Sequence, residues 1–67
     1  IEAVAPAEAG LAVGATGVAE TDLRPAGRAM IEGRIVDVQS VGRYIERGNP
    51  IRVVSTDHYV IEVEEAD

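Results

Sequence analysis

The sequence contains no cysteine, lysine, phenylalanine or tryptophan among its 67 residues. Without cysteine, the chain forms no disulfide, offers no thiolate nucleophile and holds no Cys-based zinc site. Without lysine, it forms no Schiff base and accepts no covalently attached biotin or lipoate. The Gly-rich, short-strand pattern of residues 33–54 is typical of biotinyl and lipoyl carriers. The carrier function is therefore excluded, whereas an unmodified relative of that fold stays open.

Long apolar runs are missing as well. No run approaches the roughly 20 apolar residues of a membrane-spanning helix, and the basic segment of a signal peptide is absent. The sequence starts at Ile1 rather than Met, so we interpret it as a fragment whose membrane anchor, if the parent has one, lies elsewhere. A chain of this size buries only about 60% of the surface that its unfolded form exposes. We expect one domain of marginal stability.

The net charge of −6 is unevenly distributed. Residues 1–23 carry four acidic side chains and residues 53–67 carry five, while all six arginines lie between these segments with only three acids. The middle stretch is therefore +3. An acidic chain has no general attraction for phosphate backbones, but this stretch can present a local basic face.

Short strands separated by turn residues account for most of the chain. Residues 1–12 are Ala-rich and interrupted by Pro6, which predicts a flexible tail before a domain at residues 13–65. A first strand is expected at residues 15–20. The segment LRPAG at residues 23–27 fits a type I turn with Pro25 at its second position and Gly27 at its fourth.

The pattern after this turn alternates with a period of two. It places Ala29, Ile31, Gly33 and Ile35 on one face. After Ile35 the phase slips, since the next apolar positions are 36 and 38. We interpret the slip as a β-bulge in one continuous strand, or as a continuous strand that bends from one sheet into another.

Two further strands complete the prediction after a short strand at Tyr44–Ile45 and a turn at residues 48–50. They form a hairpin with its tip at Asp57–His58, and in the second of them Tyr59, Ile61 and Val63 face one way. Five short strands without an amphipathic helix predict an all-β fold, a small closed or partly open barrel. The absence of Phe and Trp suits a narrow interior filled by Ile, Val, Leu and Ala.

Catalytic or metal-binding chemistry has little support in the sequence. His58 is the single histidine, and Asp57 is merely its chain neighbour, so we interpret His58 as an exposed hairpin residue. The acids Glu20, Asp22, Asp37 and Asp57 could in principle bind Ca²⁺ or Mg²⁺, but their spacing matches no ligand loop, and no G-x-S-x-G motif occurs. We therefore expect no catalytic residues, no metal site and no cofactor.

The stretch from about Gly14 to Glu64 resembles the C-terminal soluble domain of the NfeD family. The shared features are a Gly-led first strand, the LRPAG segment, a strand with Gly33 and Asp37, the segment GRYIERGNPIRVV at residues 42–54, and a final hairpin. The resemblance implies an all-β, five-stranded OB-fold-like β-barrel. It also implies a membrane-anchored parent, sometimes with a ClpP-like protease domain, whose soluble cytoplasmic domain works with stomatin- or flotillin-like membrane scaffold proteins.

We therefore expect a non-enzymatic protein-interaction module. The residues expected to contact the partner are Arg24, Arg28, Glu32 and Arg34. The alternative is an OB-fold domain that binds single-stranded nucleic acid, in which Arg24, Arg28 and Arg34 would form a basic patch. A metal site or enzyme that uses His58 with Asp57 is the third hypothesis. Homo-oligomerisation through an exposed strand edge is also open.

Overall fold

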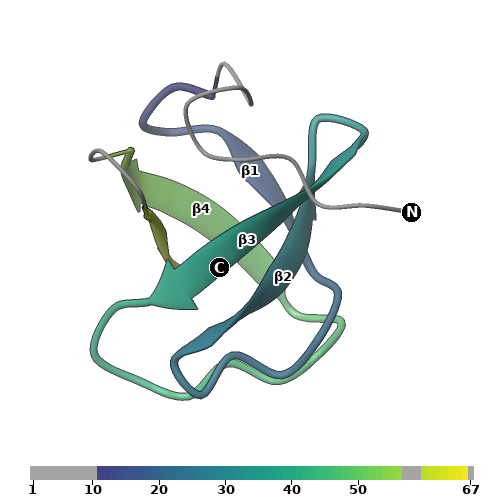
Figure 1. Cartoon of the computed structure of the whole chain (residues 1–67), viewed down its shortest axis with the longest axis vertical. Helices are drawn as coiled ribbons and strands as arrows, with labels where there is room; N and C mark the ends of the chain where they lie inside the picture. The colour runs from purple at the N-terminus through teal and green to yellow at the C-terminus, as the bar shows by residue number, and fades with distance from the viewer. Residues whose placement is uncertain (1–10, 57–59, 67) are drawn as a thin grey trace.

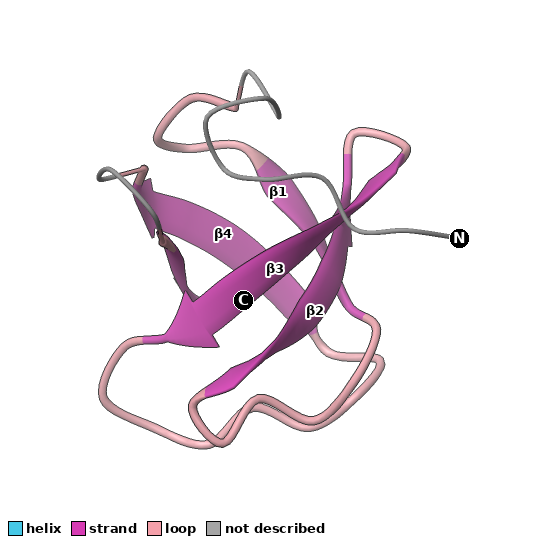
Figure 2. Ribbon diagram, viewed as in Figure 1, coloured by secondary structure: helices cyan, strands magenta, loops and turns pink. Residues whose placement is uncertain are grey.

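Five strands make up the regular structure of the computed structural model, which describes residues 11–56 and 60–66 (Figure 1). The strands are β1 (Thr16–Ala19), β2 (Ala26–Ile31), β3 (Arg34–Ser40), β4 (Pro50–Ser55) and β5 (Ile61–Glu65). They close into a barrel in the order β1-β2-β3-β5-β4. Only the β3–β5 pair is parallel, and the residues that the structure describes include no helix (Figure 2). The predicted all-β, five-stranded barrel is confirmed.

The barrel interior is filled by small aliphatic side chains, because inward and outward positions alternate along each strand. Eleven hydrophobic residues form the buried cluster: Ala19, Leu23, Ala29, Ile31, Val36, Val38, Ile45, Ile51, Val53, Ile61 and Val63. Leu11 and Ala15 pack against this cluster from before β1. The predicted interior of Ile, Val, Leu and Ala is confirmed.

The phase slip after Ile35 comes from a hairpin, so the prediction of one continuous bulged strand is wrong. Ile31 of β2 pairs with Arg34 of β3, and the two residues between them, Glu32 and Gly33, have φ values of 52° and 79°. Positive φ at both central residues defines the tight turn favoured in two-residue hairpins. Such a turn shifts the inward positions by one residue, so Ile35 points outward.

The LRPAG segment also differs from the prediction. β2 begins at Ala26, so Gly27 is a strand residue rather than the end of a type I turn, and the Arg24–Pro25 peptide bond is cis. A Cβ at Gly27 would lie 2.5 Å from Thr21 Oγ1 and 2.6 Å from Leu23 Cδ2. Glycine is therefore required here by the close approach of the preceding loop.

The segment between β3 and β4 is a loop, so the predicted short strand at Tyr44–Ile45 is wrong as well. Ile45 forms an isolated bridge with Leu23, in which the Leu23 N–H donates to the Ile45 carbonyl at 2.8 Å. The turn expected at residues 48–50 lies slightly earlier, because the N–H of Asn49 donates to the Glu46 carbonyl at 3.1 Å and β4 begins at Pro50. The strand count agrees only because the predicted second strand is two strands.

The final hairpin is described on both sides of its tip. Ile61 and Val63 are fully buried, as predicted, and Arg52 pairs with Glu64 across β4 and β5. The predicted tip at Asp57–His58 and the position of Tyr59 lie outside the described residues, as does the predicted tail at residues 1–10. Within residues 11–56 and 60–66, no helix is long and apolar enough to cross a membrane.

Candidate functional site

The outer face of the β2–β3 hairpin carries a groove of about 370 Å³. Three pairs of outward residues follow one another along this face: Ala26 with Gln39, Arg28 with Asp37, and Met30 with Ile35. The groove lies over the first two pairs, and Val60 also lines it. Its walls are mainly apolar, which suits the side chain of another molecule.

A weak ion pair borders this groove. Arg28 Nε lies 3.5 Å from Asp37 Oδ1, and both side chains are more than half exposed. An exposed pair at this distance contributes little to stability. The Arg28 guanidinium therefore remains able to donate further hydrogen bonds to a bound molecule.

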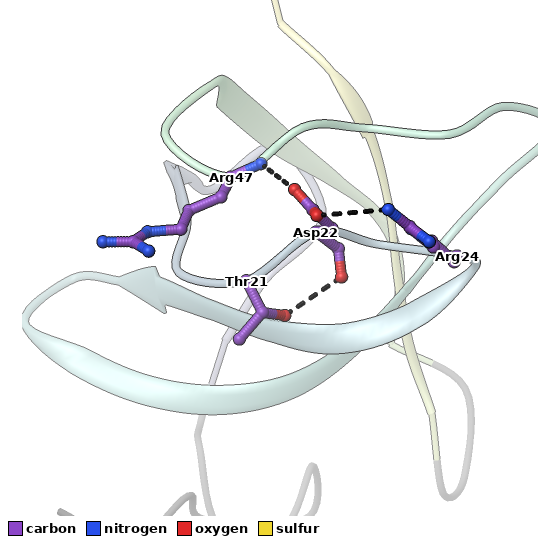
Figure 3. Close-up of polar contacts among 4 residues, drawn as sticks. All are labelled: Thr21, Asp22, Arg24 and Arg47. Carbon is purple, nitrogen blue, oxygen red and sulfur yellow. Dashed lines mark hydrogen bonds and ion pairs between the residues drawn. The ribbon is translucent and has the colours of Figure 1, made fainter.

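A second polar site joins the two loops at one end of the barrel (Figure 3). Asp22, in the loop before β2, accepts a 2.9 Å hydrogen bond from the backbone N–H of Arg47, in the loop before β4. The opposite oxygen of the same carboxylate lies 3.5 Å from Arg24 Nη2. The Arg47 N–H, assisted by the charge of Arg24, lowers the pKa of Asp22. A charged Asp22 thus ties together loops that are 25 residues apart.

Arg24 is held from two directions at this junction. Its guanidinium carbon lies 5.1 Å from the centre of the Tyr44 ring, within the range of a cation–π contact, and Asp22 holds its Nη2. Tyr44 is 47% exposed. An exposed tyrosine with an oriented arginine is typical of residues that dominate binding at protein interfaces.

The four residues predicted to contact the partner do not form one cluster. Arg24 lies at the loop junction and Arg28 on the outer face of the hairpin. Glu32 and Arg34 flank Gly33 at the turn, which lies at the other end of the hairpin (Figure 1). Arg34 pairs with the inward residue Ile31, so it does not share the outer face with Arg28. The four residues follow the length of the hairpin.

Asp22, Tyr44 and Arg47 are the residues of the junction that the sequence did not single out as a site. Tyr44 was assigned to a short strand, and the Asp22–Arg47 contact joins residues far apart in the chain. The loop before β2 contains no glycine, whereas the loop before β4 contains Gly42 and Gly48, so no shared composition indicated the contact. Among the described residues, no group of three or more His, Cys, Asp or Glu side chains could hold a metal ion. His58 and Asp57 lie outside the described residues.

Comparisons with known proteins agree with this barrel. The model of the NfeD-like C-terminal, partner-binding domain matches residues 9–65. Among solved structures, the C-terminal domain of stomatin operon partner protein 1510-C from Pyrococcus horikoshii is similar, with 27% sequence identity and a TM-score of 0.77. The alignment covers 82% of this chain and 88% of that chain. No curated protein matches the chain.

Proposed function

This chain belongs to the family of NfeD-like C-terminal, partner-binding domains, and we propose that it is a non-enzymatic module that binds a stomatin-like membrane scaffold protein. The family match over residues 9–65 carries the proposal of partner binding. The similar archaeal domain is described as part of a stomatin operon partner protein, which supports the kind of partner. We further propose that the domain lies on the cytoplasmic side of a membrane-anchored parent.

The proposed contact surface runs along the β2–β3 hairpin from the loop junction to the turn. It contains the four predicted residues Arg24, Arg28, Glu32 and Arg34. Arg24 supports the proposal best, because its exposed guanidinium lies 5.1 Å from the centre of the Tyr44 ring and this cation–π contact favours one orientation. A pre-oriented side chain loses less conformational freedom on binding than a mobile one. The groove beside Arg28 gives the same surface an apolar component.

The test measures capture of the stomatin-like protein encoded by the same genome, using the full-length parent protein. Arg24→Glu, Arg28→Glu and Arg34→Glu are compared singly and together. Arg43→Glu is the matched control, because it makes the same charge change where Arg43 lines a different pocket with Val41, Glu64 and Glu65. We expect the triple variant to lose capture and the control to retain it.

Three outcomes distinguish an error in the proposed partner from an error in the proposed surface. If the wild-type protein captures no stomatin-like protein, the proposed partner is wrong. If the wild type captures it and the triple variant captures it equally well, the partner stands and the surface is wrong. Equal losses in the triple variant and in Arg43→Glu would mean that overall charge, not this hairpin, determines binding.

A further inference from the structure

A row of apolar side chains crosses the outside of the barrel over four strands. Val18 of β1 pairs with Met30 of β2 and with Pro50 of β4, and Met30 pairs with Ile35 of β3. Paired residues of neighbouring strands point to the same side of a sheet. The adjacent strand residues Ala19, Ile31, Val36 and Ile51 are buried inside the barrel. The outer row, namely Pro50, Val18, Met30 and Ile35, therefore faces away from the interior.

Apolar residues in this arrangement need an explanation, because the solvent face of an antiparallel sheet is usually polar. Val18 is 42% exposed, Pro50 is exposed, and Met30 and Ile35 are half-buried. Single exposed apolar residues are ordinary, but a contiguous patch bordered by polar groups marks an interaction surface. The outer row is such a patch, and the groove beside Arg28 and Asp37 extends it along the hairpin.

The charges beside the outer row alternate in sign from strand to strand. Glu20, which follows β1, donates its N–H to the carbonyl of Arg28 at 2.9 Å, so these two residues lie next to each other. Arg28 in turn pairs with Asp37 of β3. The charges along this border are therefore negative at Glu20, positive at Arg28 and negative at Asp37.

We propose that two copies of this chain form a dimer through the outer row, about a two-fold axis that runs along the strands between β1 and β2. A two-fold contact is self-complementary: if residue i of one copy contacts residue j of the other, then residue j of the first copy contacts residue i of the second. With this axis, Val18 of each copy packs on Met30 of the other. On the charged border, Glu20 of each copy faces Arg28 of the other, so the contact forms two equivalent ion pairs.

The outer row borders Arg28 and the groove that also belong to the surface proposed for the stomatin-like partner, so a second copy and that partner would compete for Arg28. At the outer row itself, charge complementarity favours a second copy. Two copies of a chain with a net charge of −6 repel each other in general, so they associate best where positive and negative groups meet reciprocally. Glu20 and Arg28 satisfy that condition beside an apolar row. A purely acidic partner would meet Glu20 and Asp37, and a purely basic partner would meet Arg28.

A dimer interface of standard size would cover a modest share of the surface of this chain. A standard interface removes about 800 Å² from each partner, which is about a fifth of the 4220 Å² that the chain exposes. The outer sides of β4, β1, β2 and β3, four of the five strands of the barrel wall, contribute to the face. The apolar row supplies its centre and the charged residues its border, which is the usual anatomy of a specific interface.

The first test measures molar mass by sedimentation equilibrium of the chain alone over a range of concentrations. We expect the wild type to approach twice the monomer mass as concentration rises, and Met30→Asp to remain monomeric. Val18→Asp is the second variant of the row, used in case Met30→Asp lowers the folded fraction measured by circular dichroism. Val41→Asp is the control, because it places the same charge at an exposed valine in the loop before β4.

The second test uses the reciprocity of the ion pairs. Glu20→Arg and Arg28→Glu each place like charges across the interface, so each variant alone should be monomeric. An equal mixture of the two variants restores opposite charges at both contacts and should form a heterodimer. A dimer that is weakened in each variant and recovered in the mixture supports the proposal, whereas a mixture that stays monomeric contradicts the proposed pairing.

Other results would overturn the dimer while leaving the proposed function intact. A wild type that is monomeric at every concentration contradicts the dimer directly. If the chain is monomeric and Met30→Asp abolishes capture of the stomatin-like protein, the outer row belongs to the partner instead. A dimer that withstands both Met30→Asp and Val18→Asp uses a different face. Because the sedimentation samples contain no partner, failure of the proposed partner does not affect this test.

Discussion

Replacement of Gly17 by alanine should destabilise the barrel by crowding its interior. Gly17 pairs with Ile31 of β2 and with Ile51 of β4, and both isoleucines are fully buried. A Cβ at position 17 would overlap the carbonyl oxygen of Met30 and lie 2.8 Å from Ile31 Cγ1. No side-chain rotation removes the overlap with the Met30 carbonyl, so the β1–β2 pair has to separate.

The magnitude follows from two opposing effects. Overpacking in a well-packed interior costs roughly 1–3 kcal/mol, and a backbone overlap places Gly17→Ala near the upper end, at about 3 kcal/mol. The smaller entropy of the unfolded alanine chain offsets roughly 0.4–1 kcal/mol of this. The net loss of about 2 kcal/mol is large for a domain of this length, whose total stability is roughly 3–10 kcal/mol. It corresponds to a fall in Tm of about 8–16 °C.

Thermal unfolding followed by far-ultraviolet circular dichroism measures this loss, with Gly33→Ala as the control. A Cβ at Gly33 meets no atom within 4 Å, although the φ of 79° is unfavourable for alanine by about 1–2 kcal/mol. The entropic offset is the same in both variants, so it cancels in the comparison. Gly17→Ala should melt below Gly33→Ala. The reverse order, or a Gly17→Ala variant that melts like the wild type, would refute the packing argument.

Three further predictions concern the polar groups of the barrel. Ser40→Ala should raise the unfolding free energy by about 1 kcal/mol in urea titrations, because the buried Ser40 Oγ has no hydrogen-bond partner among the described residues. A loss of stability would show instead that the hydroxyl forms a hydrogen bond. The pKa of Asp22 is lowered from 3.8 in the folded state. The charged Asp22 therefore contributes to the unfolding free energy above about pH 4, and this contribution is lost as the pH falls through the pKa of the folded state. The difference in urea midpoint between wild type and Asp22→Asn should therefore be largest at pH 6 and shrink as the pH is lowered below 4, and a difference that does not shrink with falling pH would contradict this origin. Single-stranded DNA and RNA should leave the fluorescence anisotropy unchanged at low salt, and binding that weakens with added salt would revive the nucleic-acid hypothesis.

The strands could be predicted where the sequence alternates without interruption. Ile61 and Val63 were assigned to the same face of the last strand, and both are fully buried. Ala29 and Ile31 likewise proved to be inward residues of β2. In these segments each side chain's position follows from a period of two, which depends only on local backbone geometry. The alternating pattern, together with the turn residues, was therefore sufficient to predict an all-β barrel.

Contacts between distant loops could not be predicted in the same way. The bridge between Leu23 and Ile45 and the hydrogen bond from Arg47 to Asp22 form only after barrel closure brings two loops to the same end. Neither contact has a local pattern, because its partners are separated by more than 20 residues. The arginines could be identified as candidates from the charge distribution, but their division between two ends of the hairpin depends on the turn at Glu32.

That turn also decides what the outside of the barrel presents. Glutamate rarely adopts the positive φ that Glu32 has here, so the sequence favoured a bulge, which would leave Ile35 inside with Ile31. With the two-residue turn, Ile35 lies instead beside Met30 and Val18 on the outer face. The interior remains filled because Val36 and Val38 replace it there. The apolar surface proposed for the dimer therefore results from the same turn that keeps the core complete, and a substitution that changed this turn would alter both.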